Sequence, residues 1–283
     1  MKIIRTIDEI KKELEKYRRQ GKTIGFVPTM GALHNGHLSL VEQCRKENDI
    51  AVVSLFVNPA QFEPHEDFNT YPRDLERDEK LLRERGVDIL FSPGLNEIYP
   101  GGYLTYVEVE KMGKVLCAKS RPHHFRGVAT IVLKLFNIVN PGYAYFGRKD
   151  AQQAIIIKKM VKDLNLDVII KTMPIIRDPD GLALSSRNVY LTSEEREAAL
   201  NLPGALQKIK SEIDKGLRDV SVVKDMFQKE VKKSPLVKVD YLAVVSLDQL
   251  EEVDEIDTGN TLVAAAIRLE KTRLIDNFIL GGI

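Results

Sequence analysis

The chain has little cysteine and no long hydrophobic run, and each shortage argues against a class of protein. Cys44 and Cys117 are the only cysteines in 283 residues. Two cysteines are too few for a disulfide scaffold, so we expect reduced thiols and a cytoplasmic location. The longest apolar stretch, Val128 to Val139, is short for a membrane span and contains Lys134. The first residues lead directly into a charged helical pattern in which no signal peptide is visible.

The sequence also lacks an excess of charge of either sign. The 42 Lys and Arg residues against 41 Asp and Glu residues give a formal net charge of +1 at pH 7. Such a chain has no global field that would attract nucleic acid or an anionic membrane. Hydrophobic residues make up 43% of the sequence, enough for a sizeable core in one large domain or two smaller ones. We therefore expect small-molecule partners, with no nucleic acid and no membrane.

Strand-like and helical segments alternate through the first two-thirds of the chain. The alternation predicts an α/β fold, in which a Rossmann-like parallel sheet has helices on both faces. The predicted strands are Ile24 to Val27, Ile50 to Val57, Val87 to Phe91, Tyr143 to Phe146 and Val168 to Met173. The predicted helices between them are Asp74 to Arg85, Val128 to Val139 and Ala151 to Leu164.

The pattern changes in the last third, which predicts a smaller C-terminal α+β domain. A turn at Asp178 to Gly181 predicts a short hairpin, and Thr192 to Glu195 has the spacing of a capping box that starts a helix. Helical segments continue to about Lys233, and three strand-like runs follow at 239–245, 262–269 and 274–280. We predict a nucleotide-binding domain over 1–176 and a lid domain over 177–283.

The most informative segment lies where the first buried strand meets a helix. Free backbone N–H groups and the helix dipole favour an anion at such a junction. Glycines let a phosphate approach the backbone, and imidazoles can donate hydrogen bonds to its oxygens. Two histidines in a loop are by themselves more often incidental than catalytic. The segment reads Met30, Gly31, Ala32, Leu33, His34, Asn35, Gly36 and His37, and its His-x-Gly-His pattern is typical of enzymes that split ATP between the α- and β-phosphates.

Two further stretches follow predicted strands. Gln61 lies just past the carboxyl end of the strand that begins at Ile50, where open parallel sheets bind ligands. Taken alone, this stretch is better explained as a strand-ending turn with an exposed amide. Lys149 precedes a helix and could reach a phosphate as a point charge. Gln153 has capping-box spacing from Asp150, so a purely structural role is an alternative for it.

Two polar stretches remain. Ser185, Ser186, Arg187 and Asn188 suit a mobile clamp over a triphosphate, with a polar linker as the alternative. The donor-rich run from Arg121 to Gly127 raises the question of zinc, together with the histidines and cysteines elsewhere. Neither cysteine belongs to a pair with metal-ligand spacing, so we interpret this run as an ordered loop that closes the site.

These stretches together resemble the pantoate–β-alanine ligase family, also called pantothenate synthetases. The resemblance covers most of residues 20–190, and its motifs occur in the family's order. It implies ATP-dependent condensation of (R)-pantoate with β-alanine through a pantoyl-adenylate, a step in pantothenate and coenzyme A biosynthesis. It also implies Mg²⁺ and a homodimer. The matching stretches are 27–37, 56–62, 71–73, 124–128, 146–153 and 181–188.

The resemblance assigns roles residue by residue. It implies catalytic positions for His37, His34 and Lys149, pantoate binding by Gln61 and Gln153, and β-alanine binding by Gln61. The implied ATP-binding positions are Met30, Gly31, Ala32, Leu33, His34, Asn35, Gly36, His37, Gly147, Arg148, Lys149, Asp150, Ile176, Leu184, Ser185, Ser186 and Arg187. Leu184 departs from the methionine common in the family, and Arg148 stands where many members have another polar residue. The magnesium ligands stay unknown.

Three other functions share parts of this pattern. A nucleotidylyltransferase is the main alternative, because it also uses His-x-Gly-His but releases a nucleotide-linked product rather than AMP. A fragment of an aminoacyl-tRNA synthetase would need a basic surface, which the charge balance does not favour. A nucleotide sensor would have little use for Lys149 and the two glutamines.

Overall fold

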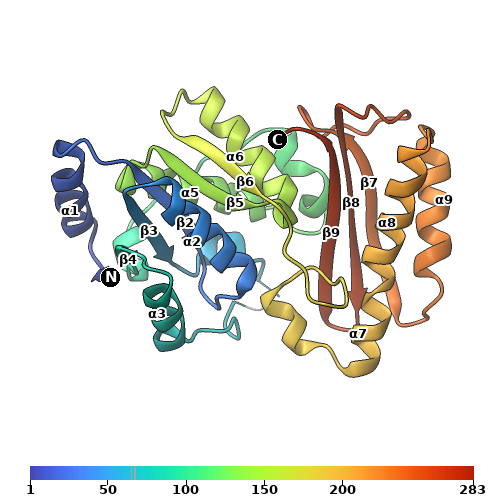
Figure 1. The fold of residues 1–283 in the computed structure, drawn as a ribbon, viewed down its shortest axis with the longest axis horizontal. Coiled ribbons are helices and arrows are strands. Elements are labelled where there is room, and N and C mark those ends of the chain that lie inside the picture. Colours follow the sequence, from blue (N-terminus) through green and yellow to red (C-terminus); the bar gives the residue numbers. More distant parts are fainter. Residues whose placement is uncertain (65, 67) are drawn as a thin grey trace. The chain divides into compact units, whose positions relative to one another are not determined.

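The computed structural model describes residues 1–64, 66 and 68–283, which Figure 1 shows as a ribbon. The chain divides into two compact units. Unit 1 contains Met1–Arg148 and Ile156–Met173, and unit 2 contains Lys149–Ile155 and Pro174–Ile283. The polypeptide thus leaves unit 1 for seven residues, returns to it, and finally enters the C-terminal unit.

Unit 1 is built on a six-stranded sheet in which every neighbouring pair is parallel, in the order β1-β4-β3-β2-β5-β6. The predicted α/β, Rossmann-like fold class is therefore confirmed. From β2 the sheet continues through β3 and β4 on one side and through β5 and β6 on the other. The direction in which strands are added therefore reverses between β2 and β5. Open parallel sheets bind ligands beyond the carboxyl ends of the strands at such a reversal. The strands are β1 (Lys2–Ile4), β2 (Ile24–Thr29), β3 (Ile50–Leu55), β4 (Ile89–Phe91), β5 (Tyr143–Gly147) and β6 (Ile169–Met173).

The helices of this part of the chain follow the predicted pattern. Helix α2 packs on β2, β3 and β5, while α5 packs on β2 and on α1. Helix α5 is buried around most of its circumference, as its nearly continuous apolar sequence predicts. Among the described residues, no helix combines the length and the apolar character that a membrane crossing needs. The helices are α1 (Ile7–Arg19), α2 (Asn35–Glu47), α3 (Leu75–Glu84), α4 (Leu95–Ile98), α5 (His124–Val139) and α6 (Ala151–Asp163).

Unit 2 consists of an antiparallel sheet and helices, with the sheet order β7-β8-β9. Its core includes Phe227 and the inward side chains of β8, which is buried at nearly every position. The Thr192 capping box that starts α7 is present, because its hydroxyl accepts from the Glu195 N–H while the Glu195 carboxylate accepts from the Thr192 N–H. The elements are α7 (Ser193–Ala199), α8 (Asn201–Asp214), α9 (Val220–Val231), β7 (Val237–Ser246), β8 (Asn260–Leu269) and β9 (Thr272–Gly281).

One local prediction was wrong, and one strand was missed. The hairpin around Asp178 is reduced to one antiparallel bridge between Arg177 and Ala183. The turn itself exists, with Gly181 at φ +97° and its N–H donating to the Asp178 carbonyl at 2.9 Å, but the flanking segments do not continue as strands. Strand β1 was not predicted at all, because three residues at a sheet edge carry too little pattern and depend on pairing with β4.

Candidate active site

The segment Met30–His37 lies at the carboxyl end of β2, where the strand order reverses. Its first part is a tight turn with two successive residues at positive φ, Gly31 at +87° and Ala32 at +51°. The Thr29 hydroxyl accepts from the Gly31 N–H at 3.3 Å and donates to the Ser54 carbonyl at 2.8 Å. The turn is thereby tied to both β2 and β3.

The two histidines cap helix α2 with their rings. The Gly36 N–H donates to Nδ1 of His34 at 3.1 Å, and the His34 N–H donates to Nδ1 of His37 at 3.4 Å. The ring centroids lie 4.1 Å apart. Because both Nδ1 atoms accept backbone hydrogen bonds, a neutral ring in this arrangement carries its proton on Nε2. The helix start therefore fixes the tautomer that presents an Nε2–H donor.

Gln61 is the last residue of the short 3₁₀ helix η1 (Pro59–Gln61), and it is buried. The Asn58 amide nitrogen donates to the Gln61 side-chain oxygen at 3.1 Å and to the Gly127 carbonyl at 3.1 Å. Tyr99 donates from its hydroxyl to the Asn58 oxygen at 2.9 Å, and burial raises the pKa of that phenol. The Gln61 Nε2 lies 2.9 Å from the Met30 sulfur, so the structure brings two predicted site residues together.

The backbone carbonyl of Gln61 is held by the loop before α5 and by the first residue of that helix. Arg121 donates to this carbonyl at 3.2 Å and to the Glu66 carboxylate at 2.7 Å, and His124 places Nδ1 2.9 Å from the same carbonyl. Burial raises the pKa of Glu66, but the Arg121 hydrogen bond and charge outweigh it and leave the pKa below its usual value. The donor-rich run from Arg121 to Gly127 thus touches Gln61, but from His124 onward it is the first turn of α5 and not the predicted loop.

Gly127 allows α5 to approach η1 closely. A Cβ at Gly127 would lie 2.1 Å from the Ala60 carbonyl oxygen and 2.6 Å from the Gln61 nitrogen. Real Cβ atoms essentially never come this close to backbone atoms, so any side chain at this position would displace η1 or α5. The absence of a side chain at Gly127 therefore lets η1, which ends at Gln61, lie directly against α5.

In unit 2, Lys149 is held through its backbone. Lys149 belongs to the 3₁₀ turn η4 (Arg148–Asp150) that follows β5, and its carbonyl accepts from the Asn277 side-chain amide at 2.9 Å. Asn277 is a buried residue of β9. The Lys149 ammonium lies 4.0 Å from the Asp150 carboxylate. Gln153 lies in the first turn of α6 and is half-buried.

The serine-rich motif of unit 2 is a short capped turn. Leu184 donates its N–H to the Ile176 carbonyl at 3.0 Å, which places these two predicted ATP positions side by side. Ser185 caps the 3₁₀ helix η5 (Ser186–Tyr190), accepting from the Arg187 N–H at 3.3 Å. Next to Ile176, Arg177 forms a bidentate pair with the buried Asp276 carboxylate at 2.6 and 3.0 Å.

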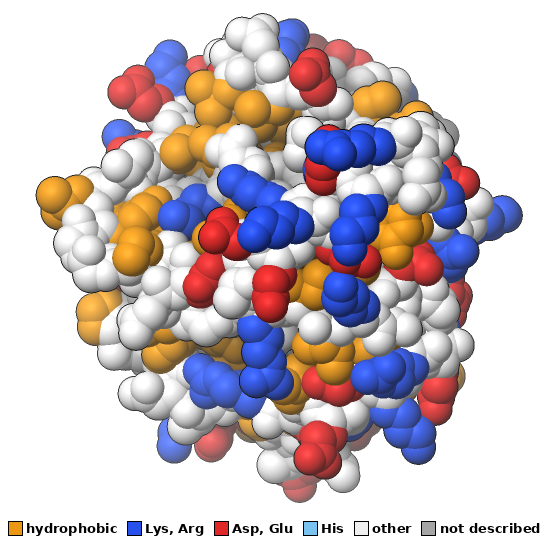
Figure 2. Space-filling model, turned by 90° about the vertical axis from the view of Figure 1, so that its left-hand side faces the viewer, with side chains coloured by type: hydrophobic (Ala, Val, Ile, Leu, Met, Phe, Trp, Pro, Cys, Tyr) orange, Lys and Arg blue, Asp and Glu red, His pale blue; other side chains and the backbone are white. Residues whose placement is uncertain are grey.

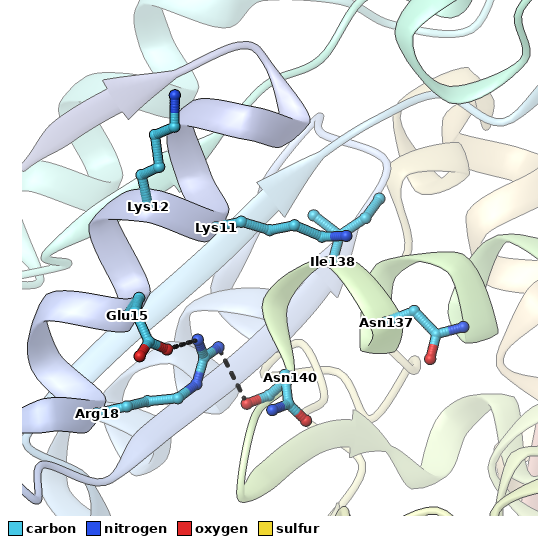
Figure 3. Close-up of a pocket in the computed structure, with 7 residues that line it drawn as sticks. All are labelled: Lys11, Lys12, Glu15, Arg18, Asn137, Ile138 and Asn140. Atoms are coloured by element: carbon cyan, nitrogen blue, oxygen red, sulfur yellow. Dashed lines mark hydrogen bonds and ion pairs between the residues drawn. The ribbon is translucent and has the colours of Figure 1, made fainter.

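A surface pocket of about 480 Å³ lies elsewhere in unit 1, where α1 meets the end of α5. Figure 3 shows Arg18 reaching from α1 to the Asn140 carbonyl and pairing with Glu15. Arg18 thus caps the last carbonyls of α5, which explains its presence in structural terms. None of the predicted site residues lines this pocket. On the face shown in Figure 2, side chains of both charge signs are interspersed.

The sequence interpretation missed Asn58, Asp78 and Asn277 as contacts of the site. A signal was available for Asp78, because it precedes the buried Leu82 by four residues and so shares the inner face of a charged helix. Asn58 was visible only as a strand end. No sequence pattern connects Asn277 with Lys149, since the contact joins residues 128 positions apart.

Comparison with known proteins identifies the family. The family model described as pantoate-beta-alanine ligase matches residues 2–279. The chain belongs to the pantoate–β-alanine ligase family. The ligase is 54% identical over 280 residues to a pantothenate synthetase of Acetivibrio thermocellus, covering 99% of both chains. It is 54% identical over 281 residues to one of Thermotoga petrophila, covering 99% of this chain and 100% of the relative.

Solved structures agree with this assignment. A crystal structure of pantothenate synthetase from Thermus thermophilus matches the ligase with a TM-score of 0.93 and 43% identity, covering 100% of both chains. A pantoate-beta-alanine ligase from Francisella tularensis, complexed with beta-gamma ATP and beta-alanine, matches with a TM-score of 0.82 and 38% identity. That match covers 99% of this chain and 97% of the Francisella chain.

Proposed function

We propose that this ligase condenses (R)-pantoate with β-alanine in two steps at the expense of ATP. A pantoate carboxylate oxygen attacks the α-phosphorus, and the bond to the leaving pyrophosphate breaks. The β-alanine amine then attacks the acyl carbon of pantoyl-adenylate and releases AMP. The observation that carries the proposal within the family is the pair of imidazoles at the start of α2, at the reversal point of the sheet.

The histidines suit the first step chemically. Attack by a carboxylate on a triphosphate needs charge neutralisation and alignment rather than a protein nucleophile. With Nδ1 accepting from the backbone, His34 and His37 would direct Nε2–H toward phosphate oxygens. We assign His37 the role of stabilising charge that develops on the triphosphate, with His34 beside it. The remaining residues of this segment, Met30 to Leu33, Asn35 and Gly36, are assigned to ATP.

Gln61 would bind pantoate and later β-alanine. Its amide oxygen accepts from Asn58, so the orientation of the amide is fixed and Nε2 is left as the donor end. A neutral donor can hold the hydroxyl or carboxylate of pantoate without a salt bridge that would weaken the attacking oxygen. We assign Gln153 to pantoate in the same capacity.

The residues of unit 2 would contribute to ATP binding. Lys149 supplies a fixed positive charge on a backbone held by Asn277, and we count it with the histidines as catalytic. We assign ATP contacts to the neighbouring Gly147, Arg148 and Asp150. We extend this assignment to the residues on the two sides of the Asp178 turn, namely Ile176, Leu184, Ser185, Ser186 and Arg187.

Magnesium would accompany ATP. In the part of the chain that the structure describes, no group of three His, Cys, Asp or Glu side chains could hold a metal ion. Mg²⁺ bound with nucleotides usually keeps waters and phosphate oxygens and needs only one or two carboxylates, a demand that the exposed Asp150 fits. Bound there, Mg²⁺ would neutralise phosphate charge.

We also propose a cytoplasmic homodimer. Cys44 and Cys117 are buried and form no disulfide in the part of the chain that the structure describes, as expected of a protein from a reducing compartment. Leu104 is 88% exposed within segment 103–109, which has no regular secondary structure, and this exposure suits burial against a second copy of the chain. Analytical ultracentrifugation of the wild type and of Leu104→Asp tests this, and a monomeric wild type would refute it.

Exchange of labelled pyrophosphate into ATP tests the function. The exchange should require pantoate but not β-alanine, because the acyl-adenylate forms before the amine acts. The main alternative is a nucleotidylyltransferase, which would exchange with a nucleotide-accepting partner and form no AMP. Exchange without pantoate, or only with another partner, would overturn the assignment.

A further inference from the structure

The turn between β2 and α2 closes around a carboxylate of the protein itself. Ala32 donates its N–H to Oδ2 of Asp78 at 2.8 Å, and Leu33 donates its N–H to Oδ1 at 2.9 Å. Successive backbone N–H groups in such a turn form a concavity that binds anions. In this chain the concavity is filled from within, so these two amides are already in use before any phosphate binds.

The contacts of Gly31 also indicate that the turn is shaped to hold the Asp78 carboxylate. A Cβ at Gly31 would lie 3.1 Å from Oδ2 of Asp78, and the φ of +87° disfavours any side chain there. The sequence suggested that this glycine makes room for a phosphate. The contact shows that it also makes room for Asp78, which enters from helix α3, 46 positions beyond Ala32.

Asp78 is built into this position. Its side chain is only 3% exposed, and the Arg77 guanidinium lies 3.7 Å from Oδ1. Burial raises the pKa of Asp78, while the two amide hydrogen bonds oppose that rise. A buried carboxylate is costly for a fold, but here it supplies the acceptors for the Ala32 and Leu33 N–H groups, which an apolar side chain of similar size would leave unsatisfied.

We propose that Asp78 is a positioning residue for adenylate formation, because it holds Ala32 and Leu33 and so sets the start of α2 that carries His34 and His37. The inference rests on the proposed function of the histidines. Asp78 does not touch the substrate; it acts through the turn.

Asp78→Asn tests the proposal with nearly unchanged volume. The amide has one acceptor in place of two, so one of the two backbone N–H groups loses its partner. We expect the rate constant of pantoate-dependent pyrophosphate exchange to fall at least about tenfold, the scale of a lost hydrogen bond to a charged group. We also expect hydrogen exchange in the peptide containing Ala32 and Leu33 to quicken by a similar factor.

Asp74→Ala is the matched control on the same helix. Asp74 caps α3 by accepting from the Arg77 N–H at 3.0 Å, and no hydrogen bond among the described residues joins its side chain to the turn. The variant should have a lower melting temperature, while the exchange rate constant and the protection of the turn stay at wild-type values. Equal kinetic losses in the two variants would show a general stability effect and overturn the proposal.

Asp78→Glu guards against a variant that does not fold. It keeps a negative charge for the two amides, and we expect it to recover part of the activity and protection lost in Asp78→Asn. Wild-type kinetics in folded Asp78→Asn, or no recovery with glutamate, would refute the proposal. Amide hydrogen exchange is measured without substrates. It therefore reports whether Asp78 holds the turn even if pantoate fails to support pyrophosphate exchange in the wild type.

Discussion

The junctions that follow β2 and β5 carry the two halves of the predicted catalytic set, and they are held in different ways. After β2, the histidines cap their own helix, and Thr29 and Asp78 hold the turn before it, all within unit 1. After β5, the carbonyl of Lys149 is held by Asn277, a residue of the C-terminal strand β9. The first junction can form once the parallel sheet and α3 have formed, whereas the second also requires the antiparallel sheet.

The difference also concerns the chemistry of the anchors. A buried carboxylate accepts from two backbone amides in the first case, and a neutral amide donates to one carbonyl in the second. Hydrogen bonds to charged groups are stronger than those between neutral groups. Loss of an anchor should therefore have a larger effect at the histidine junction than at the lysine junction.

Removal of His37 should have the largest effect. His37→Ala removes both the proposed donor and the ring that caps the His34 N–H, so we expect adenylate formation to slow about a hundredfold or more. The lost cap should lower the free energy of unfolding by about 1 kcal/mol. His37→Gln is the control, because glutamine suits this capping position but lacks the imidazole. If the glutamine variant recovered activity together with stability, the catalytic role would be wrong.

Gly127→Ala should have the next largest effect, and it tests the junction that carries Gln61. The added methyl group would strike the Ala60 carbonyl, so the free energy of unfolding should fall by about 1–3 kcal/mol. A displaced Gln61 should raise KM for pantoate by about tenfold to a hundredfold.

Gly142→Ala is the control for that variant, because the nearest heavy atom to a Cβ there, outside the chain neighbours, is 3.9 Å away. It should leave KM for pantoate unchanged. An unchanged pantoate KM in Gly127→Ala, measured by steady-state kinetics, would show that Gln61 does not depend on this contact.

Asn277→Leu tests the remote anchor. The change keeps the volume but removes the donor to the Lys149 carbonyl, so we expect KM for ATP to rise by up to about tenfold. Combined with Lys149→Ala it forms a double-mutant cycle. If Asn277 acts through Lys149, the two effects will be less than additive. Full additivity would assign the effect of Asn277 to some other contact.

Tyr145→Phe should have the smallest effect and a distinct pH dependence. The Tyr145 hydroxyl donates to the Glu47 carboxylate at 2.8 Å, linking β5 to the end of α2. This bond, followed by one from Gln43, lowers the pKa of Glu47. A lowered carboxyl pKa contributes stability that is present above the unfolded value of about 4.3 and is lost as pH falls through the folded value.

We therefore expect Tyr145→Phe to lose about 1 kcal/mol at pH 7 and less at pH 3, measured by urea unfolding. Tyr143→Phe, on the same strand, is the control. A loss that stays the same at both pH values would show that Glu47 does not contribute through this bond.

The sequence predicted the parallel sheet because its strands are strongly marked. Strand β3 is buried at every position and reads as an almost continuous apolar run, although it ends at Leu55, two residues before its predicted end at Val57. The breakers that follow α5 coincide with its observed end at Val139. The strand order and the reversal beside β2 were not predicted, since pairing depends on which strands meet in three dimensions.

The site was predicted in its motifs but not in its supports. The ring caps of His34 and His37 escaped notice because histidine is not among the usual N-cap residues. Asn58 caps η1 and Asn277 lies in β9, and the residue types alone do not indicate which groups they contact. Their roles follow from approach to Gln61 and Lys149, which only the folded backbone brings about.

Ala32 gives the histidine turn a property that a glycine would not. An alanine at φ +51° is strained relative to glycine, but the chain it belongs to has fewer backbone states to lose when it orders. In the folded protein, fewer backbone states also mean that the turn samples fewer conformations around its observed geometry. A ligand that binds to a turn already narrowed in this way gives up less conformational entropy on binding. If ATP binds to this turn as proposed, the methyl group of residue 32 lowers the conformational entropy that the turn loses on binding.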